Sequence, residues 1–329
     1  PYTGTGSPSR PDAVASGAAR VSVFTPTDAA GALAPRPDPG LAGAAWAPAT
    51  AVAENVAAKN EETTQDVAAD VTAADGDARI LYTSAYSVPG VAVTADAATL
   101  AKIAARDDVV KISRIVPQSI EVPAADGATP RNGASDALTR AVDTWQQTGH
   151  TGKGVTVAVV DTGVDYTHAD FGGPGTADAY AAALASTDAP QPGSYDPSVY
   201  LGGWDFAGAT YNGAIGQPGY NPLPEPDANP IDGPGGNHGT HVAGTTLGRG
   251  VGTDLKTFRG DYRTLSAESV QTDFSISPGA APEAGLIALK VFGDGGGSTS
   301  LTGAALEWIA QKIASGTEID VVNLSLGTN

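Results

Sequence analysis

The sequence contains no cysteine among its 329 residues and few basic residues. The lack of cysteine excludes disulfide bonds, zinc sites with thiolate ligands and a cysteine nucleophile, but it leaves the redox compartment open. The 18 Lys and Arg residues stand against 36 Asp and Glu, which gives a formal net charge of −18. Such a charge repels nucleic acids and anionic membranes, and no cluster of Lys or Arg offsets it. We therefore expect no nucleic-acid partner.

Long hydrophobic runs are also absent. No stretch of about 18 uncharged apolar residues occurs, and this excludes a membrane-spanning helix from the sequence. The hydrophobic content of 41% excludes a wholly disordered chain. The length predicts about two domains with sizeable cores. The first residue is Pro1 rather than Met, so we expect a processed or truncated chain that has lost any signal peptide.

The first part of the chain changes composition twice. Residues 1–60 form an Ala-, Pro- and Gly-rich leader with one strand-like run at 20–25. Residues 61–122 predict a small α+β domain, and residues 123–135 have the composition of a linker, where we place a domain boundary. The elements expected in the small domain are helices at 63–74 and 97–106, the second capped by Asp96, and strands at 80–86, 90–93 and 109–115. A further strand before them stays open.

Residues 136–329 have the pattern of an α/β domain with a parallel sheet. The run VTVAVV at 155–160 is apolar throughout, as in a strand buried on both faces. Residues 286–326 predict a βαβ unit, with strands at 286–292 and 319–326 around a helix at 301–315.

Two loop-rich stretches flank a segment of small residues. Residues 172–237 contain Pro, Gly, Asn and Asp throughout, and residues 249–277 resemble an insertion. Between them, GNHGTHVAGTTLG at 236–248 predicts a helix that packs closely against its neighbours.

Unusual residues follow each predicted strand of the α/β domain. Asp161 ends the first strand, the glycine run Gly293–Gly297 follows the second, and Ser325-Leu326-Gly327 ends the third. In open parallel sheets, functional groups gather at the carboxyl ends of the strands. We therefore expect a functional site at this edge of the sheet.

Asp161 allows several interpretations. A strand-ending aspartate often caps the next turn, and a buried one can orient an imidazole. Asp-Thr-Gly also occurs in aspartic peptidases, which need two carboxylates that share a proton. The chain has one Asp-Thr-Gly, no Asp-Ser-Gly and α/β rather than all-β surroundings, so we set that chemistry aside.

His238 and His241 are two of only four histidines in the chain. In one interpretation, both histidines have a structural role on a helix, where packing and hydrogen bonds satisfy them. HGTH lacks the glutamate and the spacing of the zinc motif HExxH. An imidazole that faces a buried aspartate can instead accept a hydroxyl proton from a nucleophile and return it to a leaving group.

The order of these segments resembles the subtilisin-like serine peptidases, the subtilases. Asp161-Thr162-Gly163, the GNHGTHVAGT segment with His238 and the VVNLSLG segment at 321–327 are similar to the three successive signatures of this family. DYTHADF at 165–171 and GAAP at 279–282 are similar as well, so the resemblance covers residues 145–329. It implies an incomplete subtilisin-like catalytic domain and a larger family member with an inserted protease-associated domain.

The resemblance assigns roles residue by residue. It implies that Asp161 is the triad aspartate, that His238 is the general base and that His241 is structural. It also implies two edge segments that hold an extended protein or peptide substrate between them. These segments are Gly295, Gly296, Gly297 and Ser298 on one side and Ser325, Leu326 and Gly327 on the other.

Residues 61–122 are similar in pattern to the prosegment inhibitor domain of subtilases. This similarity implies a zymogen whose prosegment tail lies in the active-site cleft until cleavage within Ile120–Ser135. It also implies that the protein is secreted.

A subtilase needs an oxyanion asparagine and a nucleophilic serine in a Gly-Thr-Ser context. No Gly-Thr-Ser occurs, and neither Asn323 nor Asn329 lies in the motif for the oxyanion role. The resemblance therefore implies that both groups lie outside these 329 residues, in a longer polypeptide or a C-terminal companion chain. The alternative is a non-catalytic, peptide-binding relative that has lost the nucleophile.

The implied chemistry requires no cofactor, although structural calcium is common in the family. Asp170 falls where one ligand of a family calcium site often lies, but residues 249–277 replace the loop that completes that site. Asp227, Asn229 and Asp232 form a second oxygen-rich cluster. Calcium needs about six to eight oxygens, and Asx turns account for these residues equally well, so the metal ligands stay open.

Overall fold

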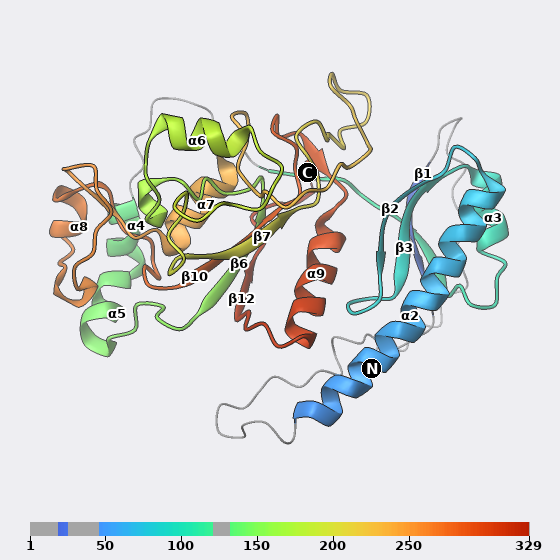
Figure 1. Cartoon of the computed structure of the whole chain (residues 1–329), viewed down its shortest axis with the longest axis horizontal. Coiled ribbons are helices and arrows are strands. Elements are labelled where there is room, and N and C mark those ends of the chain that lie inside the picture. The colour runs from blue at the N-terminus through green and yellow to red at the C-terminus, as the bar shows by residue number, and fades with distance from the viewer. Residues whose placement is uncertain (1–18, 26–45, 121–131, 329) are drawn as a thin grey trace. The chain divides into compact units, whose positions relative to one another are not determined.

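The computed structural model describes residues 19–25, 46–120 and 132–328. The chain divides into two compact units, one of residues 1–116 and 306–317 and the other of residues 117–305 and 318–329 (Figure 1). Within the described ranges, none of the helices combines the length and apolar character needed to cross a membrane.

The first unit is an antiparallel sheet covered by helices. Its strand order is β2-β3-β1-β4. Val67 and Val71 of α2 and Leu100 of α3 pack on Val21 and Val93 of the sheet. The elements are β1 (Ala19–Phe24), α2 (Trp46–Ala74), β2 (Arg79–Ser84), β3 (Gly90–Ala95), α3 (Ala97–Ile103) and β4 (Lys111–Arg114).

Several predictions for this unit are confirmed, and two are wrong. Asp96 caps α3, because its side chain accepts a hydrogen bond from Thr99 N at 2.6 Å. The helix expected at 63–74 already begins at Trp46, so the expected boundary at residue 60 lies inside α2. The run at 20–25 does not belong to a separate leader, since β1 pairs with both β3 and β4. The rest of that leader and most of the expected linker lie outside the described residues.

The second unit is built on a parallel sheet with the order β12-β6-β10-β7. Every residue of β6 (Thr156–Asp161) and β10 (Gly285–Lys290) is buried, as the apolar run predicts. Leu247 of α7 (His238–Leu247) packs with Val157 and Leu286 on one face of the sheet. The α/β class and the parallel sheet are therefore confirmed.

The loop-rich stretch 172–237 contains regular structure that the sequence pattern concealed. It includes α6 (Ala177–Leu184) and β7 (Tyr200–Asp205), which pairs with β10. Strand β7 has the sequence YLGGWD, without the β-branched run typical of a strand. A Cβ at Gly203 would lie 2.1 Å from Ala288 O, so close strand pairing requires the glycine.

The remaining elements of the second unit are short. They are β5 (Gln118–Ser119), α4 (Asn132–Thr139), α5 (Ala141–Thr148), η1 (Ala169–Phe171), β8 (Val251–Gly252), η2 (Tyr262–Thr264), α8 (Ser269–Thr272), β9 (Phe274–Ile276), β11 (Ser298–Thr299) and β12 (Val321–Asn323). Helix α9 (Thr302–Ala314) crosses the boundary between the units.

One buried carboxyl group makes stability depend on pH. Asp136 lies in α4, is 3% exposed, and its Oδ2 has no hydrogen-bond partner within the described residues. Burial raises the pKa of Asp136 to about 7. The unfolded chain releases this proton near its ordinary pKa of about 3.9. Stability therefore falls as pH rises between these values and stays low above them.

We expect Asp136→Asn to raise the melting temperature by a few degrees at pH 8 and to leave it unchanged at pH 4, because the amide never ionises. Thermal unfolding followed by circular dichroism measures this difference. The exposed Asp188 serves as the control, and Asp188→Asn is expected to have no such pH-dependent effect. Equal melting temperatures of Asp136→Asn and the parent protein at pH 8 would contradict the assignment.

Candidate active site

Asp161 and His238 form a pair at the end of β6, one of the two inner strands of the parallel sheet. Asp161 is the last residue of β6 and is fully buried. Its Oδ1 lies 2.8 Å from His238 Nδ1 and accepts a hydrogen bond from Thr162 N at 2.7 Å. Its Oδ2 has no partner among the described residues. The structure therefore brings together the two residues that the sequence singled out.

The imidazole of His238 is held at the first turn of α7. Its Nδ1 edge faces Asp161, so Nε2 lies on the other edge of the ring. The hydrogen bond and the negative charge of Asp161 raise the pKa of His238 above its ordinary value, although partial burial opposes them. This arrangement suits an imidazole that takes up a proton during a reaction.

Helix α7 approaches β6 closely because Gly239 has no side chain. A Cβ at Gly239 would lie 2.2 Å from Gly163 O and 3.0 Å from the Cβ of Asp161. Gly239 N instead donates a hydrogen bond to Thr162 Oγ1 at 2.8 Å. The predicted close packing of this small-residue helix is confirmed, and it sets the distance between Asp161 and His238.

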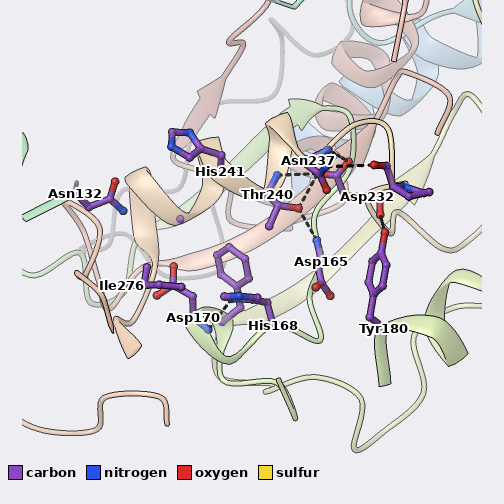
Figure 2. A pocket seen from close by; sticks show the side chains of 13 residues that line it. Asn132, Asp165, His168, Asp170, Tyr180, Asp232, Asn237, Thr240, His241 and Ile276 are labelled. Atoms are coloured by element: carbon purple, nitrogen blue, oxygen red, sulfur yellow. Dashed lines mark hydrogen bonds between the residues drawn. The ribbon is translucent and has the colours of Figure 1, made fainter. Parts of the chain in front are cut away.

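Asp232 fixes the N-terminus of α7. Its Oδ1 accepts from Asn237 N at 3.0 Å, and its Oδ2 accepts from Thr240 N at 3.0 Å and Thr240 Oγ1 at 2.6 Å (Figure 2). Burial raises the pKa of Asp232 above its ordinary value, against these hydrogen bonds. The sequence placed Asp232 in an oxygen-rich cluster and missed this role, because the contact spans more residues than a local capping motif.

A buried lysine lies beside the pair, at the end of the neighbouring strand β10. Lys290 is 2% exposed, and its Nζ lies 3.1 Å from Asp205 Oδ2 and 2.6 Å from Asp294 Oδ1. Burial would lower the pKa of Lys290, but the two carboxylates outweigh it and raise the pKa. Lys290 therefore stays charged and anchors Asp294, the residue before Gly295. The sequence assigned no role to this residue at the end of an otherwise apolar strand.

The glycine run leads into an edge strand that the loop-rich stretch 172–237 supports. Gly296 and Gly297 have φ values of 71° and 88°, which favour glycine. Gly213 N donates to Ser298 O at 2.7 Å. The buried Tyr211 accepts a hydrogen bond from Ser300 N at 3.0 Å through its hydroxyl group. The loop before α7 thus holds β11 in place.

The structure places part of the chain itself between the two predicted edges. Ser119 pairs with Ser298 of β11 on one side. On the other side, Ser119 N donates to Gly327 O at 2.8 Å, and Gly327 N donates to Ser119 O at 3.0 Å. An extended segment therefore lies between Ser298 and Gly327, as the resemblance implies for a peptide.

A separate pocket of about 450 Å³ is lined partly by α7. Exposed His241 contributes to this pocket, and His238 and Asp161 do not. Figure 2 shows Asp165, Asp170 and His168 around the same pocket. The Asp161–His238 pair and this pocket are thus distinct, and His241 does not join the pair.

The proposed calcium ligands make other contacts. Asp170 Oδ1 accepts a hydrogen bond from Gly250 N at 2.8 Å, and Gly250 lies in the insertion-like stretch 249–277. Asn229 Oδ1 accepts from Tyr166 Oη at 2.8 Å, and Asp227 Oδ1 accepts from Asn229 N at 2.8 Å. Across the described ranges, no group of three or more His, Cys, Asp or Glu side chains is placed to hold a metal ion. Structural calcium therefore stays a prediction.

Known proteins are similar to the half of the chain that carries this site. A family model described as the subtilase family, Peptidase_S8, matches residues 152–329. The chain is 30% identical over 207 residues to the minor extracellular protease Vpr of Bacillus subtilis (strain 168). The aligned segment covers 63% of this chain and 17% of that protein. It is 27% identical over 200 residues to the PII-type proteinase of Lactococcus lactis subsp. cremoris, which covers 61% of this chain and 9% of that protein. The chain thus spans a small part of these relatives.

The geometry predicts that Asp161 controls the proton affinity of His238. We expect Asp161→Asn to lower the pKa of His238, because the carboxylate that stabilises the imidazolium is lost. Proton NMR titration of the four histidines measures it, with single His→Gln variants for assignment. Asp165→Asn is the control, because Asp165 does not contact His238. An unchanged His238 pKa in Asp161→Asn would contradict the pairing.

Proposed function

The chain belongs to the subtilase family, a family of serine peptidases, and from this premise we propose that it carries the prosegment and the N-terminal part of the catalytic domain of a secreted serine endopeptidase. The observation that carries the proposal is the 2.8 Å contact between His238 Nδ1 and the fully buried Asp161. Secretion draws support from Vpr, whose name describes an extracellular protease.

The proposed reaction is acyl transfer to a serine that lies outside these 329 residues. The serine Oγ attacks the peptide carbonyl carbon, a C–O bond forms, and His238 Nε2 takes the hydroxyl proton. When the C–N bond breaks, the imidazolium returns this proton to the leaving amine. Water then repeats the sequence and releases the acid. Asp161 fixes the imidazole tautomer and stabilises the imidazolium throughout.

Two features of this chain support the proposal that the nucleophile lies elsewhere in the polypeptide or in a companion chain. The sequence contains no Gly-Thr-Ser. Among the described strands of the parallel sheet, β12 lies at one edge, and Val321, Val322 and Leu324 are 48%, 36% and 41% exposed there. An exposed apolar strand of this kind is an ordinary surface for further strand pairing and packing. We propose that the part of the enzyme that carries the serine covers it.

We also propose that residues up to the cleavage region keep the enzyme inactive. Residues Gln118 and Ser119 form backbone pairs with β11, and Ser119 also pairs with Gly327. A substrate needs the same backbone groups, so this segment competes with it directly. Cleavage is proposed within Ile120–Ser135, of which residues 121–131 lie outside the described residues.

The proposed function predicts that the reactive serine lies outside residues 1–329. We expect a fluorophosphonate probe to label the native preparation, and intact-mass and peptide-mass analysis to place the label beyond residue 329 or on a second chain. His238→Ala is expected to abolish the labelling and to lower peptide hydrolysis by about 10⁶-fold, as in other disrupted triads. His241→Ala is the matched control and is expected to retain labelling.

The outcomes separate the candidate functions. A label within residues 1–329 would contradict the placement of the serine. If a processed preparation takes up no label and hydrolyses no peptide, this result would contradict the proposed peptidase function. It would favour the alternative function of a non-catalytic, peptide-binding relative.

A further inference from the structure

The segment that lies in the cleft makes a side-chain contact as well as backbone pairs. Gln118 pairs with Thr299 of β11, one residue before the Ser119 pair with Ser298. The Oε1 atom of Gln118 accepts a hydrogen bond from the hydroxyl group of Thr302, the first residue of α9. Both side chains are half-buried. The contact joins residues 184 positions apart, so it does not arise from local chain geometry.

The backbone that leads into Thr302 is held in position by the structure behind it. Leu301 N donates to Thr299 Oγ1 at 3.0 Å, and Ser300 N donates to the Tyr211 hydroxyl at 3.0 Å. Leu301 is 1% exposed and fixes the start of α9 against the core. A donor that is fixed before the peptide arrives contributes more to selectivity than a mobile one, because less freedom is lost on binding.

We propose that Thr302 is a specificity-determining residue, which selects substrates with an amide side chain at the position of Gln118. This position is one residue before the residue that pairs with Gly327. The inference rests on the proposed function and defines the substrate class of the same cleft. An apolar side chain there would remove the hydrogen bond of the half-buried Thr302 hydroxyl, which costs free energy.

Hydrolysis of a matched peptide series tests the selectivity. The peptides carry residues 114–128 of the chain with Gln, Asn, Leu, Ala or Glu at position 118, and the enzyme is the processed full-length protein. We expect kcat/KM for Gln to exceed that for Leu by about tenfold or more, because a site built for a hydrogen bond rejects analogues that lack it.

Variants of Thr302 attribute that preference to its hydroxyl group. Thr302→Val keeps the shape without the hydroxyl, and the ratio of Gln to Leu is expected to fall to about one or below. Thr302→Ser keeps the hydroxyl and is expected to retain the preference. Thr317→Val, an exposed change beyond the end of α9, serves as the control and is expected to leave the ratio unchanged. Equal kcat/KM values across the series, or a preference that survives Thr302→Val, would overturn the inference while the peptidase function stands.

Hydrogen exchange of the unprocessed protein tests the contact independently of catalysis. In Thr302→Val and Gln118→Ala, we expect the amide of Ser119 to exchange at least several-fold faster, because the segment is held less firmly. Thr302→Ser and Thr317→Val are expected to match the parent protein. Unchanged exchange in Thr302→Val would overturn the inference even where no peptide is hydrolysed, and the absence of hydrolysis would overturn the proposed function alone.

Discussion

The close approach of helix α7 to the end of strand β6 is the constraint on which the site depends. It places His238 Nδ1 2.8 Å from Asp161 Oδ1 in a position from which water is largely excluded. Gly239 permits the approach, since any Cβ there would meet Gly163 O at 2.2 Å. Asp232 ties down the first turn of the helix with hydrogen bonds to Asn237 and Thr240. A pair fixed in this way has little reorganisation left to make during proton transfer.

The walls of the cleft depend on contacts that lie behind them. Lys290 binds Asp294 at 2.6 Å and so anchors the glycine run that leads to β11. The loop-rich stretch 172–237 supports the same strand through Gly213 N, which donates to Ser298 O. Because both supports are buried or bonded, the edge strand can present its backbone to an extended peptide without ordering itself first. The same pre-ordered strand lets the chain's own residues Gln118 and Ser119 occupy the cleft.

The sequence predicted the parts of this site that are encoded locally. The apolar run that ends at Asp161 and the small residues around His238 mark a buried strand and a closely packed helix, and both are present. Strand β7 escaped notice because its glycines suit close pairing with β10 and lack the β-branched pattern. The role of Lys290 depends on Asp205, which is distant in the sequence, as well as on Asp294 four residues further on. The contacts of Asp232 with Asn237 and Thr240 span more residues than a local capping motif, so no short pattern marks them.

The substitution Gly239→Ala in the processed full-length protein tests the central constraint most directly. The added methyl group forces α7 away from β6 and separates His238 from Asp161, while the core residues remain. We predict that kcat/KM falls by about 100-fold or more with a preserved circular dichroism spectrum, since a shift of about 1 Å in a catalytic group has that effect. Wild-type kcat/KM in Gly239→Ala would show that catalysis does not depend on the close approach of α7 to Asp161.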